Sequence, residues 1–265
     1  MLLEIDNLDV SFKGDDGKIV EAAKGVSLSL DRGEVLGIVG ESGSGKSSVA
    51  MSVARLLPSP PAFWPKGRIL FDGEDVLSMP VARLRKLRGR RIGVIFQDPI
   101  GSLSPLHRIG DQIAETILLH ESVSKSTARD TAVEWLGKVG IPAPAERARA
   151  YPHELSGGMQ QRVVIAMALV LGPDLVIADE PTTALDATVQ AQVLDLMKAL
   201  MADNSGLLLI SHDLGVVSRM ATRIAVMKNG KVVETADDTA AFFASPKHEY
   251  SRALVREAER MELKK

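Results

Sequence analysis

The chain has 265 residues, and its 32 lysines and arginines nearly balance 34 aspartates and glutamates, which leaves a formal net charge of −2. This balance gives no electrostatic support for general nucleic-acid binding. The chain has no cysteine, so disulfides, iron–sulfur clusters and thiol catalysis by its own residues are excluded, and we expect a reducing compartment. The length suits one large α/β domain, or one domain with a sub-domain.

The sequence predicts neither a secretory signal peptide nor a membrane-spanning segment. Residues 1–6 carry acids where a signal peptide carries bases. The most apolar segment, residues 163–171, is far shorter than the roughly 20 residues that span a bilayer. We therefore expect a protein that docks on a membrane at most.

The N-terminal third predicts strands. Residues 2–10 and 19–30 alternate loosely between apolar and polar side chains, as strands with one buried face do. The proline-rich residues 58–65 predict an ordered loop that covers a sheet edge, and residues 68–71 predict a further strand.

A basic run follows near residues 83–91. On a helix opening near residues 78–80, Val81, Leu84 and Leu87 share one face and the bases lie mostly on the other. A solvated helical face is the favoured interpretation, and a nucleic-acid patch is the less favoured one.

Residues 40–47 match the pattern G-x-x-x-x-G-K-[ST], between a predicted buried strand at 35–39 and a predicted helix at 48–55. Glycines let the backbone approach a phosphate closely, and the helix N-terminus offers N–H groups to the anion. We expect Lys46 to reach the β- and γ-phosphates and Ser47 to ligate Mg²⁺. The residues expected to bind nucleotide here are Gly40, Glu41, Ser42, Gly43, Ser44, Gly45, Lys46, Ser47 and Ser48.

Three further predicted strands, at residues 92–96, 175–178 and 207–210, also end in polar side chains. Ligands of an open parallel sheet lie beyond the carboxyl ends of its strands, so we expect these ends to share one crevice with the phosphate loop. The residues at these ends are Gln97, Asp179 and Glu180, and His212.

Phosphoryl transfer needs charge neutralisation and an oriented water, and these residue types can supply both. Asp179 fits an acid that holds Mg²⁺, directly or through water, and Glu180 fits the general base. Gln97 can bridge Mg²⁺ and the attacking water, and His212 can hydrogen-bond the γ-phosphate.

Helical periodicity without a convincing strand extends from residue 98 to about 155, with helices at 111–120 and 125–139. This pattern predicts a helical sub-domain inserted in the α/β core. Beyond it we expect a helix at 188–201 and a hairpin around Asn229-Gly230. A charged and solvated terminal helix is expected after Ser245-Pro246.

Residues 155–162, LSGGMQQR, open a helix predicted to reach residue 171, with Ser156 as a good N-cap. Gly157 and Gly158 let a phosphate approach the helix N-terminus. The chain therefore has a second expected anion site but only one phosphate loop.

In this order the motifs resemble those of ATP-binding-cassette (ABC) ATPases, over about residues 2–250. The resemblance implies a P-loop NTPase core with a mostly parallel sheet, an antiparallel N-terminal β subdomain and an inserted helical subdomain. It implies an aromatic at Phe12 that stacks on adenine, a D-loop at residues 183–186, and a head-to-tail pair of cassettes. Ser156, Gly157 and Gly158 would then bind ATP held by the partner cassette, and Asp186 would connect the two sites.

A finer resemblance concerns residues 95–99, 102–105, 151–159 and 178–186, which are similar to the ATPase subunits of oligopeptide, dipeptide and nickel importers. Many peptide members extend further and carry a C-terminal cysteine cluster, whereas this sequence ends at Lys265 without cysteine. That departure favours the shorter nickel or metal-chelate type over the peptide type.

The resemblance predicts an ATP- and Mg²⁺-dependent translocase subunit on the cytoplasmic face of the inner membrane. Its partners would be two transmembrane permease subunits, a second ATPase subunit, identical or paralogous, and an extracytoplasmic solute-binding protein, with no nucleic acid. The expected divisions are residues 1–97 with 156–239 as the ATP-binding core, 98–155 as the helical insert, and 240–265 as a helical tail. The cargo stays open.

Three rival functions are weighed against the importer. A soluble cassette that acts on ribosomes or DNA usually has two cassettes in one chain, a long coiled coil or basic arms, and none is present. A non-hydrolysing nucleotide regulator is disfavoured because Glu180, Gln97 and His212 are all intact. An exporter cassette would not explain the importer-type motifs.

Overall fold

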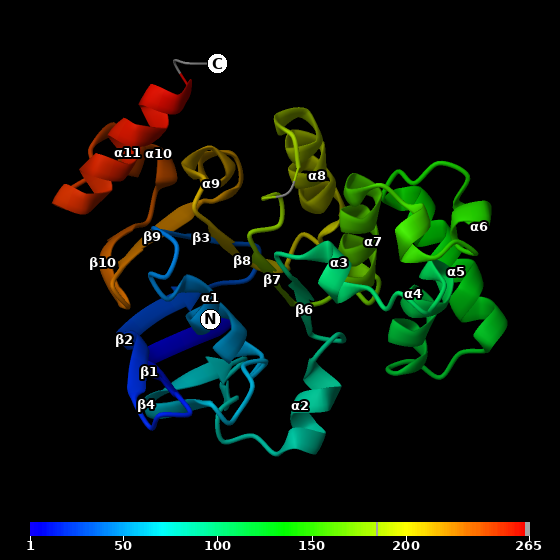
Figure 1. Cartoon of the computed structure of the whole chain (residues 1–265), viewed down its shortest axis with the longest axis horizontal. Helices are drawn as coiled ribbons and strands as arrows, with labels where there is room; N and C mark the ends of the chain where they lie inside the picture. Colours follow the sequence, from blue (N-terminus) through cyan, green and yellow to red (C-terminus); the bar gives the residue numbers. More distant parts are fainter. Residues whose placement is uncertain (184, 263–265) are drawn as a thin grey trace. The chain divides into compact units, whose positions relative to one another are not determined.

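The computed structural model describes residues 1–183 and 185–262. Figure 1 shows and labels its helices and strands. Contacts between residues divide the chain into two compact units. The first unit comprises Met1–Leu84 with Gly206–Lys265, and the second comprises Arg85–Ser205. Each unit has its own strands and its own part of the predicted functional residues.

The first unit begins with an antiparallel sheet in the order β2-β1-β4-β5. Its strands are β1 (Leu3–Lys13), β2 (Ile19–Leu30), β4 (Ala62–Phe71) and β5 (Glu74–Asp75). The apolar side chains that alternate along β1, such as Leu3, Ile5, Leu8 and Val10, are buried. The predicted antiparallel N-terminal sheet is confirmed.

The prediction of a loop over residues 58–65 is wrong in part, because β4 begins at Ala62 and includes Phe63, Trp64 and Pro65. Pro65 has no N–H to donate and is tolerated where strand pairing is irregular. The register between β1 and β4 shifts at this point, between the pairs Asp9↔Lys66 and Ser11↔Phe63. Trp64 also donates its Nε1–H to Ser52 Oγ, at 2.8 Å, which holds this end of β4 to the helix after the phosphate loop.

Four more strands, parallel except for β10, form the rest of the first unit's sheet structure. The strand β3 (Val35–Val39) pairs in parallel with β8 (Gly206–Ser211) and with β9 (Arg223–Lys228), and β9 pairs antiparallel with β10 (Lys231–Ala236). The strands β3 and β8 are continuous apolar runs and are buried, as strands covered on both faces are, whereas β10 is only half-buried. The helices of this unit are α1 (Lys46–Val53), α9 (Leu214–Met220), α10 (Thr239–Ala244) and α11 (Glu249–Glu262).

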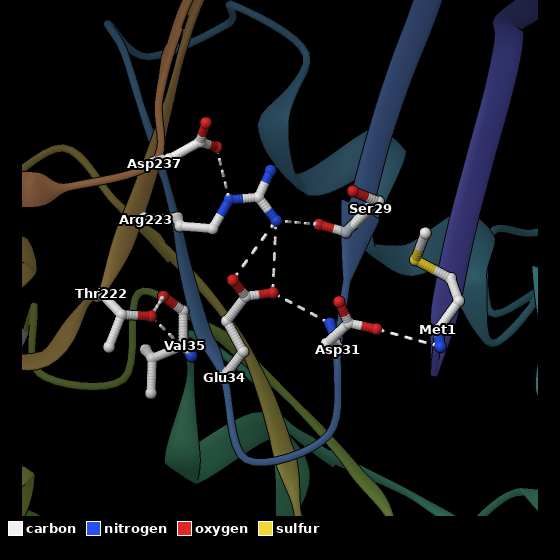
Figure 2. Close-up of polar contacts among 8 residues, drawn as sticks. All are labelled: Met1, Ser29, Asp31, Glu34, Val35, Thr222, Arg223 and Asp237. Carbon is white, nitrogen blue, oxygen red and sulfur yellow. Dashed lines mark hydrogen bonds and ion pairs between the residues drawn. The ribbon is translucent and has the colours of Figure 1, made fainter.

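Arg223 joins the two sheet regions of the first unit (Figure 2). Its Nη1 donates to both carboxylate oxygens of Glu34, at 3.2 and 3.3 Å, and to the Ser29 carbonyl at 3.1 Å. The Glu34 carboxylate also accepts the Asp31 N–H at 2.9 Å. The cluster therefore ties the start of β9 to the end of β2 and to the turn that leads into the phosphate-loop strand.

The second unit has two parallel strands, β6 (Ile92–Ile95) and β7 (Leu175–Asp179). Between them the described chain is helical and contains no strand, as the sequence predicts. The helices are α3 (Pro99–Ser102), α4 (Ile109–Leu118), α5 (Lys125–Lys138), α6 (Pro144–Arg147), a 3₁₀ turn at Pro152–Glu154, and α7 (Gly157–Leu169), followed after β7 by α8 (Ala187–Leu200).

The helix α2 (Val81–Leu87) contains the residues where the first unit gives way to the second. Leu84 and Leu87 are buried as predicted, but Val81 is 53% exposed. Val81 is the first residue of α2, directly after Pro80, so no earlier helical turn lies over it. The prediction of a shared apolar face is therefore wrong for Val81.

Candidate functional site

The phosphate loop, residues 40–47, leads from β3 into α1 within the first unit, as predicted. Gly40 and Gly45 have φ angles of +152° and +99°. A Cβ at Gly40 would lie 2.1 Å from the Met227 carbonyl oxygen, and one at Gly45 would lie 2.1 Å from the Ala22 carbonyl oxygen. The motif glycines are thus required by close backbone approaches within the protein itself.

The loop is also hydrogen-bonded to the turn between β9 and β10. The Gly230 N–H donates to the Ser44 carbonyl at 3.0 Å, and the Lys24 N–H on β2 donates to the Gly230 carbonyl at 2.8 Å. The predicted hairpin turn at Asn229-Gly230 therefore has a second role, because its hydrogen bond to Ser44 holds the phosphate loop in place.

Lys46 is 4% exposed and is held over the loop. Its Nζ donates to the carbonyls of Gly40 and Glu41, at 2.7 and 2.8 Å. The helix α1 that it opens has Gly45 as its N-cap, with no side-chain cap. A buried ammonium and a helix N-terminus without a capping side chain are the donors that an anionic phosphate needs, so these residues fit a nucleoside triphosphate.

Phe12 and His212 lie elsewhere in the first unit. Phe12 is half-buried on β1, opposite Val20 of β2, which is 63% exposed. Together they form an apolar surface suited to a flat aromatic ring. His212 is exposed and directly follows β8, and Asp213 beside it caps α9 by accepting the Gly215 N–H at 2.8 Å.

In the second unit, the residues that follow β6 and β7 are hydrogen-bonded to each other through their side chains. Gln97 Nε2 donates to Glu180 Oε2 at 3.1 Å, and Thr183 Oγ1 donates to the same oxygen at 2.9 Å. Glu180 has a φ of +48°, a conformation that an ordinary residue adopts at a cost and that clusters at functional sites. Asp179, the last residue of β7, is buried. The structure thus brings Gln97 and Glu180 together, as predicted.

The LSGG stretch opens α7 as predicted. Ser156 is its N-cap and accepts the Met159 N–H at 3.4 Å. A Cβ built at Gly157 would meet no heavy atom within 4 Å, whereas one at Gly158 would lie 3.3 Å from Val189 Cγ1. The surface over Gly157 is therefore open for a ligand to approach the helix N-terminus closely.

Asp186 is the N-cap of α8, and its carboxylate accepts the N–H groups of Thr188 and Val189, at 3.1 and 3.0 Å. The predicted D-loop also includes Ala184, which lies outside the described residues. A capping carboxylate stabilises its helix through the N–H groups it accepts. Asp186 therefore has a local structural role in addition to the one predicted for it.

Comparison with known proteins identifies the family. The model of the family described as "ABC transporter" matches residues 23–183, more than half of the chain. The chain belongs to the ABC transporter family. It is an ATPase cassette of the kind whose hydrolysis is coupled to transport, and the predicted fold class is confirmed with it.

Two curated relatives place the cassette within the oligopeptide/dipeptide group of this family. It is 49% identical to the oligopeptide transport ATP-binding protein OppD of Bacillus subtilis over 255 residues, which are 96% of this chain and 71% of the relative. It is 46% identical to the dipeptide transport ATP-binding protein DppD of the same organism over 263 residues, which are 99% of this chain and 78% of the relative.

Among solved structures, the cassette is similar to the ATP-binding cassette MJ0796 in a dimeric, post-hydrolysis state bound to ADP and Pi. The TM-score is 0.78 with 29% sequence identity, over 88% of this chain and 97% of that one. That cassette is a nucleotide-bound dimer, which agrees with ATP as the ligand of this family. None of the described helices here is both long enough and apolar enough to cross a membrane.

Tyr250 lies beside the phosphate loop of this cassette but belongs to none of the sequence motifs. The Tyr250 hydroxyl, from α11, accepts the Glu41 N–H at 3.0 Å. The sequence analysis had no signal for this contact, because it predicted the terminal helix to be charged and solvated. That prediction is wrong for Tyr250, Ser251 and Val255, which are buried.

Proposed function

We propose that this cassette hydrolyses ATP to energise the import of peptides. The observation that carries the proposal is 49% identity to an oligopeptide transport ATP-binding protein over 96% of the chain. The relatives described here are named for oligopeptides and dipeptides, which favours peptides over the nickel or metal-chelate cargo that the missing cysteine cluster suggested. Nickel rests on the wider resemblance alone.

Each predicted site residue has a proposed part in hydrolysis. The phosphate loop and Lys46 bind the phosphates, and the apolar surface of Phe12 receives the adenine. Glu180 polarises the attacking water as general base, because its carboxylate is held by Gln97 and Thr183 in one orientation. His212 hydrogen-bonds the γ-phosphate.

A magnesium ion would neutralise charge on the β- and γ-phosphates. The proposed ligands Ser47, Gln97 and Asp179 offer hydroxyl, amide and carboxylate oxygens, which are the atoms that Mg²⁺ prefers. Gln97 donates through its Nε2 to Glu180, so its Oε1 is the atom left to accept or coordinate. Within the described residues no three His, Cys, Asp or Glu side chains gather as a metal site.

We propose that two cassettes pair, this chain with itself or a paralogue, and that Ser156, Gly157 and Gly158 bind the nucleotide of the partner cassette. Asp186 would connect the two sites. Binding of two ATPs then closes the dimer and hydrolysis opens it, which converts binding energy into motion.

The proposed membrane contact lies on the helical part of the second unit. Exposed apolar side chains gather on α3, α4 and the segments around them, including Ile100 at 69%, Leu106 at 82% and Leu119 at 72% exposure. A groove of about 270 Å³ beside α4 and α5 is lined by Ala114, Leu118 and Leu119, with Asp111, Glu115, Lys125 and Arg129 around them. An apolar centre with a charged rim fits a protein partner, here a transmembrane permease subunit. The cassette would then sit on the cytoplasmic face of the membrane, with a solute-binding protein outside.

The test is deletion of the gene followed by complementation, with peptide uptake as the readout. Loss of growth on peptides as the sole source of a required amino acid, restored by wild type but not by Glu180→Gln, supports the proposal. Normal peptide uptake with lost ⁶³Ni accumulation would assign nickel instead. Affinity capture from native membranes is the second arm, and recovery of ribosomal or DNA-repair proteins without a membrane subunit would contradict an importer.

A further inference from the structure

The start of the phosphate loop makes a contact that no motif of the site contains. Glu41 is the second residue of the loop, and its N–H donates to the Tyr250 hydroxyl at 3.0 Å. Its carbonyl accepts from Lys46 Nζ at 2.8 Å. Both polar groups of this backbone unit are therefore engaged, one by the phosphate-binding lysine and the other by the C-terminal helix.

The tyrosine that makes this contact is held from several sides. Tyr250 is 6% exposed, and Lys228 Nζ from β9 lies 4.4 Å from the centroid of its ring. Its own N–H donates to His248 Nδ1 at 3.1 Å. An aromatic ring under a cation, with its backbone fixed, has little freedom to turn its hydroxyl away from Glu41.

The beginning of α11 is in turn anchored to the sheet of the same unit. The Glu234 carboxylate, on β10, accepts the N–H groups of Lys247 and His248, both at 2.8 Å. These residues lie directly before α11, so the carboxylate fixes the position at which the helix begins. The link from β10 through α11 to the phosphate loop therefore consists of hydrogen bonds whose acceptors, Glu234 and Tyr250, are half-buried and buried, while the donating residues are exposed.

The chemistry of the hydroxyl suits a permanent contact. Burial raises the pKa of the Tyr250 phenol, the Glu41 N–H acts in the opposite direction, and the Glu41 carboxylate raises the pKa again. A phenol whose pKa is raised stays protonated at ordinary pH, and this one accepts the Glu41 N–H.

We propose that Tyr250 is a positioning residue for nucleotide binding, which holds the first turn of the phosphate loop so that the loop is preorganised for phosphate. The inference rests on the proposed function of residues 40–47 as the phosphate site. Gly40 is already fixed by its close approach to Met227, and the Ser44 carbonyl by Gly230. Glu41 lies between these two fixed points, where Lys46 holds its carbonyl and Tyr250 holds its N–H.

The consequence falls on nucleotide affinity and leaves the chemical step alone. Gln97 and Glu180 keep their mutual hydrogen bond whether or not Tyr250 has a hydroxyl, since they belong to the other compact unit. A loop that must be ordered by the ligand binds that ligand more weakly. ATP and ADP are affected alike, because the loop contacts phosphates that both nucleotides carry.

The experiment compares wild type with Tyr250→Phe in the full chain, by equilibrium binding of ATP and ADP and by steady-state hydrolysis. We expect Kd for both nucleotides and KM for ATP to rise about three- to tenfold, the loss that one net hydrogen bond accounts for. The kcat at saturating ATP stays within about twofold of wild type.

Asp238→Ala is the matched control. The Asp238 carboxylate caps α10 in the same unit by accepting the Ala240 and Ala241 N–H groups, at 2.7 and 3.2 Å. Its loss lowers the thermal midpoint without touching the loop, so nucleotide Kd is expected to stay at the wild-type value. Equal changes of Kd in Tyr250→Phe and Asp238→Ala would overturn the inference, because general destabilisation would explain both.

Lys46→Ala separates this inference from the proposed function. If Lys46→Ala loses nucleotide binding while Tyr250→Phe binds like wild type, the positioning role is refuted and the phosphate site stands. If Lys46→Ala binds like wild type, the site itself is wrong and the inference falls with it. Hydrogen exchange of wild type gives a check that needs no variant: the Glu41 amide is expected to be protected, and exchange at the rate of an open amide overturns the proposal.

Discussion

Two glycines of the phosphate loop allow the steric demands of the loop to be measured separately from its backbone conformation. Gly43 and Gly45 both have positive φ angles, +78° and +99°. A Cβ at position 43 would meet no heavy atom within 4 Å, whereas one at position 45 would lie 2.1 Å from the Ala22 carbonyl oxygen. Alanine is therefore strained at both positions, but only at position 45 does it collide with β2.

The left-handed conformation costs a residue other than glycine about 1–2 kcal/mol. Displacing main chain around an inserted carbon adds about 1–3 kcal/mol. We expect Gly43→Ala to lower the free energy of unfolding by about 1.5 kcal/mol, and Gly45→Ala by about 3.5 kcal/mol. At about 2–4 °C per kcal/mol for a protein of this size, the midpoints fall by about 3–6 °C and about 7–14 °C.

The assay is thermal and urea unfolding of both variants and wild type, without nucleotide. Nucleotide is left out because its binding would add stability in proportion to affinity and mix the two effects. Equal losses for the two alanines would refute the reasoning, since the contact between Gly45 and Ala22 would then contribute nothing. A larger loss at Gly43 would refute it too, and would mean that the loop has a different path.

Three further changes test other parts of the cassette. Glu180→Gln is expected to bind ATP with wild-type affinity while hydrolysis falls by about 10²–10⁴-fold, as loss of a general base predicts, and normal turnover in an ATPase assay would contradict the assignment. Ser156→Arg is expected to abolish the ATP-induced dimer seen by size-exclusion chromatography and to leave monomer binding intact, and loss of ATP binding itself would place the LSGG stretch in the wrong site. Glu234→Gln tests the anchor of α11: burial raises the pKa of Glu234, but its hydrogen bonds, those from the Lys247 and His248 N–H groups included, lower it overall from the usual 4.5. A lowered pKa means that the carboxylate contributes stability above pH 4.5, which is lost as the pH falls through the folded pKa. In urea unfolding we expect the variant to have a free energy of unfolding about 1 kcal/mol below wild type at pH 7, and this difference to shrink below pH 4.5. A difference that stays constant with pH would refute the anchor.

The sequence predicted best those features that depend on local pattern. The continuous apolar run at residues 35–39 is β3 with the same bounds, and the runs at 175–178 and 207–210 are strands within one residue at each end. Such segments are buried on both faces, and no polar requirement interrupts them. The N-cap at Ser156 was likewise predictable, since serine is a preferred N-cap whose hydroxyl accepts a backbone N–H of the first helical turn.

What the sequence failed to predict depends on partners distant in the chain. Residues 62–65 belong to β4 because a bulge opposite β1 accommodates Pro65, and no local pattern specifies that bulge. Tyr250 looked like one more residue of a charged helix, yet its partner Glu41 lies 209 residues earlier. The proximity of Gln97 and Glu180 was predicted only because the topology of parallel strands brings their ends to one edge. The tail predicted as helical at 240–265 is two helices, α10 and α11, and Asp238 caps the first of them.

The hydrogen bond from Gly230 to Ser44 has a practical consequence for anyone who modifies this protein. Surface hairpin tips with an Asn-Gly turn are the usual choice for inserting an epitope or a fluorophore, since most tolerate extra residues. Here an insertion at the tip between β9 and β10 would separate the nucleotide loop from its support and abolish binding while the sheet stayed folded. The tip at residues 14–18 joins β1 to β2 and is exposed throughout. It is no safe alternative for a label, because Phe12 and Val20, the apolar surface proposed to receive the adenine, pair directly beside it.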